Sequence, residues 1–226
     1  MSLGDLLRTN AAYREFTDEP VTDQVLHRIL DTARFAPSGG NRQPWRVVVV
    51  KDPDERRFVR EQYQIAWREY VAHLREGLIP FAPITHRRWI TPAVDLDAAH
   101  ATPAPNEFAD HLEDTPCMLL LFVDLTALAV LDNGLDRQSI VGGGSIYPFG
   151  YNVLLAAREE GLGGVMTTAL CRREPEVMAR FGVPEQFGLA ALIAIGYPVR
   201  VLTKLRRAEV AAFTTIDRFD GESFGG

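Results

Sequence analysis

Two stretches of the sequence carry residue types suited to ligand binding. The first, APSGGNRQPW, spans residues 36–45 and sets two glycines beside Ser38 and Asn41. Glycine lets a backbone approach a ligand closely, so this loop can offer bare amide donors next to a hydroxyl and an amide. The second, VMTTA, spans residues 165–169 and holds two consecutive threonine hydroxyls. An ordinary helix-to-strand connection and an ordinary strand use the same residue types, so both interpretations stay open at this level.

The overall charge limits the kinds of partner. The 226-residue chain has a formal net charge of −6, and its 46% hydrophobic and 24% charged residues are usual for a globular protein. An acidic chain argues against a nucleic acid or an anionic membrane surface as partner, because either would need a basic face. A local basic pocket remains compatible with this balance.

No metal site and no disulfide are expected. His86, His100 and His111 share a segment with several carboxylates, but their spacing matches no metal-binding motif. Cys117 and Cys171 lie far apart without metal spacing, which is typical of buried thiols in a reduced compartment. The first residues show no secretory signal, and the longest apolar stretch, residues 118–131, is shorter than the ~20 residues of a membrane helix. We expect a cytoplasmic protein.

Hydrophobic periodicity predicts the elements that position the two stretches. A short first helix contains Leu3, Leu6 and Leu7, and further helices are expected over residues 22–35, 52–74 and 145–160 and from Glu174 onward. Apolar runs predict strands at residues 46–50, 118–124 and 187–195, with an extended piece at 165–169. No repeat or composition break divides the chain. We expect one domain, residues 1–226, of helices around a small mixed or antiparallel sheet.

Two segments lack clear periodicity. Residues 77–115, called the lid segment below, are rich in proline and aromatic residues, and a stretch of this length is more often a functional lid or binding loop than a plain connection. A surface excursion is the alternative. The tail, residues 199–226, carries apolar and aromatic side chains that need a surface to lie on. A second subunit would provide one.

Four motifs together resemble the nitroreductase-like flavoprotein family. They are Arg14-Glu15-Phe16, the loop 36–45, the helix NVLLAAREEGLG at residues 152–163, and GYP at residues 196–198. The resemblance implies an α+β nitroreductase-like fold and an intertwined homodimer with FMN at its interface. It also implies that NADPH or NADH reduces the flavin, which then passes electrons to a small aromatic acceptor.

The resemblance also assigns roles to individual positions. Arg14 falls where the family places a cation near flavin N1 and O2. The segment 165–168 is similar to that of the iodotyrosine deiodinase-like branch, so Thr167 or Thr168 would be the catalytic residue that donates to N5. Lys204 and Arg206 match basic residues that reach the phosphate. The remaining positions implied to bind the cofactor are Arg8, Pro37, Ser38, Gly39, Gly40, Asn41, Gln43, Val165 and Met166, and the loop is often supplied by the neighbouring subunit.

The sequence departs from the family pattern at two places, which limits the functional roles that the resemblance implies. Residues 10–12 read Asn-Ala-Ala where the family often has Arg-Arg-Ser, so Arg8, Arg206 or Arg207 must compensate, or phosphate binding is weaker. No lysine occurs between Lys51 and Lys204, so the zwitterionic amino-acid recognition of a deiodinase-type lid is not expected.

We expect instead a flat acceptor that stacks on Tyr63, Tyr70 and the aromatic residues of the lid segment, while Arg87 and Arg88 bind its negative groups. The leading hypothesis is therefore an FMN-dependent NAD(P)H oxidoreductase that reduces a nitroaromatic or quinone by a ping-pong mechanism. The alternatives are reductive dehalogenation or other flavin chemistry in the same family, and a non-catalytic flavin-binding or storage protein.

Overall fold

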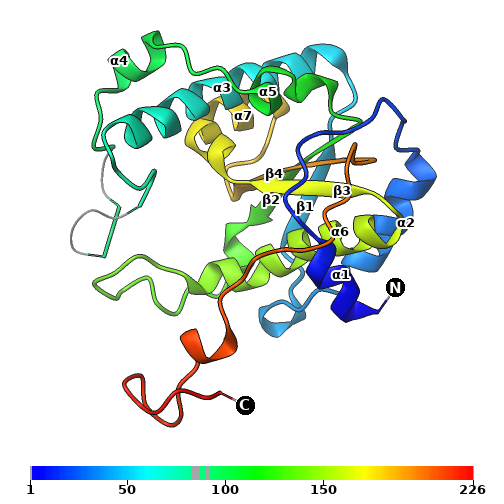
Figure 1. The fold of residues 1–226 in the computed structure, drawn as a ribbon. Coiled ribbons are helices and arrows are strands. Elements are labelled where there is room, and N and C mark those ends of the chain that lie inside the picture. The colour runs from blue at the N-terminus through cyan, green and yellow to red at the C-terminus, as the bar shows by residue number, and fades with distance from the viewer. Residues whose placement is uncertain (1, 83–86, 90–91, 226) are drawn as a thin grey trace.

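A four-stranded antiparallel sheet lies at the centre of the described residues. The computed structural model describes residues 2–82, 87–89 and 92–225. Within them the strand order is β1-β2-β4-β3 (Figure 1), with β1 Trp45–Val49, β2 Cys117–Asp124, β3 Gly163–Thr167 and β4 Phe187–Gly196. All three strand pairs are antiparallel, and an isolated parallel bridge joins Ala12 to Gly164. The sheet is thus antiparallel and not mixed.

Both faces of the sheet are covered, which explains the unbroken apolar runs of β2 and β4. Successive side chains of a strand point to opposite faces. In β2, Leu119 and Leu121 belong to one buried cluster, whereas Leu120 and Phe122 belong to another. An apolar residue is therefore needed at almost every position of a central strand, as in other sheets buried on both sides.

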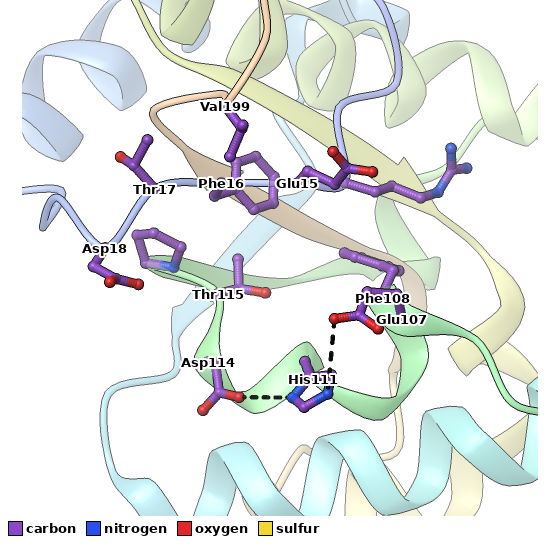
Figure 2. Close-up of a pocket in the computed structure, with 12 residues that line it drawn as sticks. Glu15, Phe16, Thr17, Asp18, Glu107, Phe108, His111, Asp114, Thr115 and Val199 are labelled. Atoms are coloured by element: carbon purple, nitrogen blue, oxygen red, sulfur yellow. Dashed lines mark hydrogen bonds and ion pairs between the residues drawn. The ribbon is translucent and has the colours of Figure 1, made fainter.

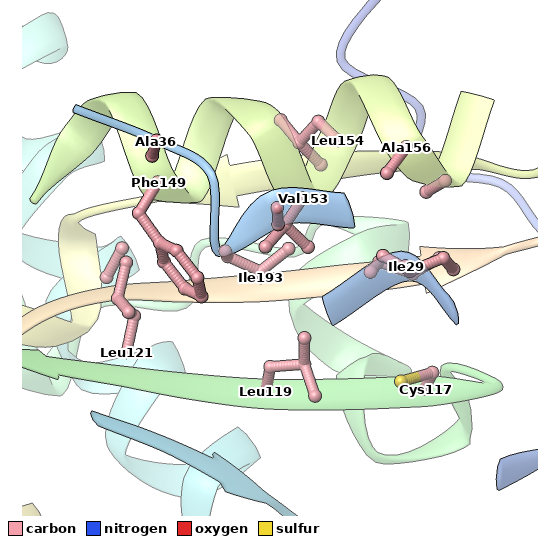
Figure 3. Packing of buried hydrophobic residues seen from close by; sticks show 14 of the residues in the cluster. Ile29, Ala36, Cys117, Leu119, Leu121, Phe149, Val153, Leu154, Ala156 and Ile193 are labelled. Carbon is pink, nitrogen blue, oxygen red and sulfur yellow. The ribbon is translucent and has the colours of Figure 1, made fainter. Parts of the chain in front are cut away.

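Helices α2 (Asp23–Ala33) and α6 (Tyr147–Glu159) cover one face, called the α6 face below. The Thr22 hydroxyl caps α2 by accepting from the backbone N–H of Val25. Figure 3 shows Ile29 of α2 and Val153 of α6 directed toward the strand residues. The α1 helix (Leu3–Thr9) contacts α6.

Helices α3 (Pro53–Arg75), α5 (Glu107–Asp110) and α7 (Glu174–Phe181) cover the opposite face (Figure 1), called the α3 face below. Asp52 caps α3, since its carboxylate accepts from the backbone N–H groups of Asp54 and Glu55. A 3₁₀ turn, η5 (Ala169–Arg173), follows β3 and contacts α3. This turn brings the end of β3 under the long helix.

The lid segment contains regular structure that periodicity did not predict. It holds α4 (Leu96–Ala101), α5 and the 3₁₀ turn η2 (Leu112–Asp114). Each of these elements spans two turns or fewer, which is too short to show a 3.6-residue repeat. Side-chain caps at Asp95 and Asn106 set the starts of α4 and α5. Residues 83–86 and 90–91, including His86, lie outside the described residues.

The tail crosses the edge of the sheet and then leaves it. The backbone N–H of Val199 donates to the carbonyl of Glu15, and that of Leu202 donates to the Tyr13 hydroxyl. Beyond them the tail, with the short turn η6 (Val210–Ala212), extends away from the body of the chain (Figure 1). Phe213 and Phe219 are exposed there. Among the helices of the described chain, none is both long and apolar enough to cross a bilayer.

Candidate functional site

An aromatic cavity of about 510 Å³ opens on the α3 face beside the end of β3. Three of its rings lie on one face of α3, because positions 63, 67 and 70 are separated by about one helical turn each. The other two rings come from the lid segment, one of them from α5. This aromatic wall consists of Tyr63, Trp67, Tyr70, Phe81 and Phe108.

The rings of the aromatic wall pack against one another in an ordered way. Trp67 and Tyr70 stack with centroids 5.0 Å apart, and Tyr70 lies 6.1 Å from Phe81. Phe108 meets the edge of Tyr63 at 5.9 Å and 90°. Such offset and edge-on geometries are the favourable ones for aromatic pairs, so the wall offers apolar ring faces and edges to a planar ligand.

The two threonines after β3 have different surroundings. The Thr167 hydroxyl lies 3.3 Å from that of Tyr63, and it also accepts from the backbone N–H of Ala169 at 3.4 Å. Burial raises the pKa of the Tyr63 phenol, although the Thr167 hydroxyl and the Arg14 charge oppose that rise. Thr168 is exposed. Its hydroxyl is therefore the freer of the two to meet a ligand.

Arg14 lines the cavity and also a second hollow next to it. Its guanidinium lies 6.0 Å from the centre of the Phe108 ring and donates to the carbonyl of Ala12. The second hollow, of about 270 Å³, is shown in Figure 2. There His111 lies 3.3 Å from Asp114 and 3.9 Å from Glu107. Several carboxylates line this hollow, so it is poorly suited to a phosphate.

The outer edge of β3 faces the same region. The backbone N–H of Tyr13 donates to the carbonyl of Gly164 at this edge. Backbone groups alternate in direction along an antiparallel strand, so the N–H and C=O of Met166 point away from β4 as well. The side chains of Val165 and Met166 pack into the cores of the two faces. These two residues can therefore reach a ligand only through their backbone.

The loop 36–45 lies on the α6 face. The backbone N–H of Gly39 donates to the Ser145 hydroxyl, and Ser38 Oγ accepts from the backbone N–H of Gln43. Gly39–Asn41 form a 3₁₀ turn, η1, and Gly40, Asn41 and Gln43 have positive φ values of 61°, 53° and 50°. Glycine tolerates this backbone conformation, and asparagine tolerates it better than most residues. None of the described residues of this loop lines the aromatic cavity, because the sheet lies between them.

The basic residues expected near a phosphate also lie outside the cavity lining. Arg8 is exposed on α1, and Lys204 and Arg206 are exposed in the tail. Asn10, at a position where the resemblance leads one to expect an arginine, is buried, and its Oδ1 has no hydrogen-bond partner among the described residues. A single chain thus brings Arg14, Thr167 and Thr168 together at the aromatic cavity. The other side chains expected to bind the cofactor lie outside its lining.

Two arginines that were expected to bind the acceptor form hydrogen bonds within the chain. Arg87 donates to the carbonyl of Asp136, and Arg88 donates to that of Leu135. Both side chains therefore hold the lid segment to the loop before α6 and do not line the cavity. Of the cavity residues, Trp67 and Asn106 were missed by sequence reasoning. The spacing of Trp67 from the two tyrosines was the signal that could have revealed it.

The described chain contains no group of three or more His, Cys, Asp or Glu side chains arranged to hold a metal ion. Cys117 and Cys171 are free thiols, and burial raises their pKa values to about 11 and about 12. Neither thiol lines the aromatic cavity in the part of the chain described. The polar side chains that line the cavity beside the aromatic wall are those of Arg14, Asn106, Thr167 and Thr168.

Comparison with known proteins agrees with this architecture. The sequence is 30% identical to rat (Rattus norvegicus) iodotyrosine deiodinase 1 over 200 residues, which is 88% of this chain and 63% of that protein. It is 28% identical to an NADH dehydrogenase of Thermus thermophilus over 213 residues, covering 82% of this chain and 81% of the other. The chain thus spans less than two thirds of the length of the rat relative.

A solved structure is also similar. The crystal structure of oxidized iodotyrosine deiodinase bound to FMN and 3-iodo-L-tyrosine matches with a TM-score of 0.64 at 24% identity, over 97% of this chain and 99% of that one. At this level of sequence identity, the similarity shows only that the two proteins share a fold. The family model for the nitroreductase family matches residues 8–197. This match spans the sheet, the aromatic cavity and the loop 36–45, and the chain therefore belongs to the nitroreductase family.

Proposed function

We propose that the protein is an FMN-dependent NAD(P)H oxidoreductase that reduces a planar aromatic acceptor by a ping-pong mechanism. The observation that carries the proposal is the meeting of Arg14, the exposed Thr168 and the open edge of β3 beside the aromatic cavity. A cation, a hydroxyl and free backbone groups at the border of an aromatic surface are what a flavin ring requires. The FMN-bound deiodinase structure and the NADH dehydrogenase relative support the choice of cofactor and reductant.

The residues at the site have the chemical groups that would bind FMN. When bound, FMN would supply the electron transfer between a nicotinamide and the acceptor. Arg14 would stabilise negative charge near N1 and O2, and Thr168 would donate a hydrogen bond toward N5. Thr167, held by Tyr63, would keep this segment in position. The backbone of Val165 and Met166 would border the ring, and Arg8, Lys204 and Arg206 would reach the phosphate.

A homodimer would complete this site. Pro37, Ser38, Gly39, Gly40, Asn41 and Gln43 lie on the face opposite Arg14, so a second chain is the simplest way to bring them to the same flavin. An apolar groove of about 900 Å³ lies next to this loop and is lined by residues including Leu128, Val130 and Tyr151. These three side chains and the aromatic residues of the tail are partly or largely exposed. Exposed apolar side chains grouped around a groove are typical of an interface.

The acceptor we propose is a nitroaromatic, a quinone or a similar planar molecule. The described residues that line the aromatic cavity include neither a carboxylate nor a lysine. An amino-acid substrate would leave its ammonium group without a counter-ion there. Reductive dehalogenation is the second candidate because of the deiodinase relatives, and 3-iodotyrosine is the substrate that tests it.

An absorbance titration tests the proposal. The purified protein, with and without added FMN, is treated anaerobically with NADPH or NADH and then with 4-nitrobenzoate, menadione or 3-iodotyrosine. Flavin bands that bleach with a nicotinamide and return with the nitro compound or quinone are expected. Recovery with 3-iodotyrosine alone would favour dehalogenation. Bound flavin that neither nicotinamide reduces would indicate a storage or binding role, and failure to bind FMN would refute all three functions.

A further inference from the structure

An ion-paired arginine, Arg172, lies at the centre of the contacts that hold the lid segment. Its Nε donates to Glu69 Oε2 at 2.8 Å, and its guanidinium lies 5.1 Å from the centre of the Trp89 ring and 5.9 Å from that of Phe81. Both distances are within the range of cation–π attraction. Arg172 belongs to η5, four residues after Thr168. One side chain therefore joins the threonine segment, α3 and the lid.

Glu69 is the buried partner of this pair. Its side chain is 2% exposed, and its second oxygen lies 3.0 Å from Nε2 of His100 on α4. Burying a carboxylate is costly unless it is paired and hydrogen-bonded. Glu69 thus needs Arg172, and through His100 it holds a second part of the lid segment against α3.

Phe81 is the residue of the aromatic wall that Arg172 and its neighbours hold in place. It forms part of the aromatic wall, and its φ of 57° is an unusual backbone conformation for a bulky residue. Such a conformation persists only when its surroundings determine it. Besides the guanidinium, Tyr70, His73 and Trp89 surround the Phe81 ring at 6.1, 5.4 and 6.2 Å.

We propose that Arg172 is a positioning residue for the acceptor site, which holds Phe81 and Trp89 of the lid segment so that the aromatic wall is formed before a ligand binds. This inference builds on the proposed function, because it gives the wall its role in acceptor binding. Preorganisation of a binding surface lowers the entropy cost of binding. Loss of Arg172 therefore weakens acceptor binding more than it slows the chemical step.

Arg173 provides a matched control. It is the next residue of η5, is similarly exposed, and pairs with Glu176 and Gln62 away from the lid. The variants to compare are Arg172→Gln, Arg172→Lys, Arg173→Gln and the double variant Glu69→Gln/Arg172→Met. The double variant removes both charges and so leaves no buried carboxylate unpaired. Arg172→Lys keeps the ion pair but loses the planar group that lies over the rings.

Two measurements on the protein as purified and on the FMN-loaded protein are needed. Hydrogen exchange of residues 78–82 reports the lid directly and requires no activity. The dissociation constant of 4-nitrobenzoate for oxidised protein, from calorimetry, reports the wall. For Arg172→Gln we expect both the exchange rate and Kd to rise about tenfold, with kcat at saturating acceptor changed by less than about twofold. Arg172→Lys should lie between this variant and the wild type.

Two results would overturn the proposal. One is that Arg172→Gln and Arg173→Gln give the same exchange rate and the same Kd. The other is that the double variant restores both wild-type values, which would mean that only the unpaired charge of Glu69 matters. If the wild-type protein is not reduced by a nicotinamide, the proposed function fails, but the exchange and binding measurements still decide the role of Arg172.

Discussion

The Thr167 hydroxyl should stabilise the folded protein, whereas that of Thr168 should not. Replacement of Thr167 by Val removes the oxygen that contacts the Tyr63 hydroxyl at 3.3 Å and the Ala169 N–H at 3.4 Å. Both distances are long for hydrogen bonds. Each contact should thus contribute about 0.5 kcal/mol, the lower end of the usual range.

A further cost comes from the Tyr63 hydroxyl itself. Tyr63 is 4% exposed, and an unsatisfied buried hydroxyl costs about 1–3 kcal/mol. Because Tyr63 borders the aromatic cavity, water can replace part of the lost bond. We therefore expect Thr167→Val to lower the free energy of unfolding by about 1–2 kcal/mol, and exposed Thr168→Val to change it by less than about 0.5 kcal/mol.

Urea unfolding followed by circular dichroism measures both values. A double-mutant cycle with Tyr63→Phe isolates the contact between the two hydroxyls, and its coupling energy should be about 0.5–1 kcal/mol. Equal stabilities of Thr167→Val and Thr168→Val, or a coupling energy of zero within error, would refute the structural role given to the Thr167 hydroxyl. In the FMN-loaded protein we expect Thr168→Val to shift the flavin absorbance bands.

Three further outcomes are expected. The pKa of Asp132 is held far below its usual value, first by the backbone N–H of Ile140 and then by Arg137 and Ser139. This interaction stabilises the protein above about pH 4 and is lost as the pH falls below that value, so Asp132→Asn should be less stable at pH 7 and should reduce the pH dependence of acid unfolding. Gly164→Ala would bring a Cβ within 2.7 Å of a backbone carbonyl, and should lower the free energy of unfolding by about 1–3 kcal/mol. Because burial raises the pKa of Cys117 to about 11, a thiol reagent at pH 8 should label Cys117 only after unfolding.

The predictions for Asp132 and Gly164 each have a matched control variant, and the prediction for Cys117 has a result that would contradict it. Asp136 lies in the same loop with a side chain 91% exposed, and Asp136→Asn should leave the acid unfolding curve unchanged. A Cβ at Gly134 would meet no atom within 4 Å, so Gly134→Ala should be nearly neutral. Rapid labelling of Cys117 in the folded protein would contradict its burial. Equal effects in a matched pair would contradict the contact assigned to the first member.

Local signals in the sequence predicted most of the elements. The predicted starts of the helices at residues 22 and 52 coincide with the caps Thr22 and Asp52, because a side-chain oxygen next to an apolar repeat favours the start of a helix. The apolar runs of β2 and β4 predicted central strands for a similar reason, since burial on both faces requires an apolar residue at every position. The short helices of the lid segment were not predicted, because their caps are not followed by a helical repeat of apolar residues.

The placement of the site residues required the tertiary structure. Ser38 and Thr167 both looked like ligand-binding positions, but they lie on opposite faces of the sheet. Strand order and the face on which each connection leaves the sheet depend on contacts between distant parts of the chain. A single sequence carries no local signal for them.

The same limit applies to the pair Glu69 and Arg172. The two residues are 103 positions apart, and each by itself looks like a charged surface residue of a helix or turn. The sequence alone determined the longer helices and the strands, because those choices depend on neighbours within a few residues. The tertiary structure decided which side chains meet, because a buried carboxylate such as Glu69 is stable only where packing places a charged partner beside it.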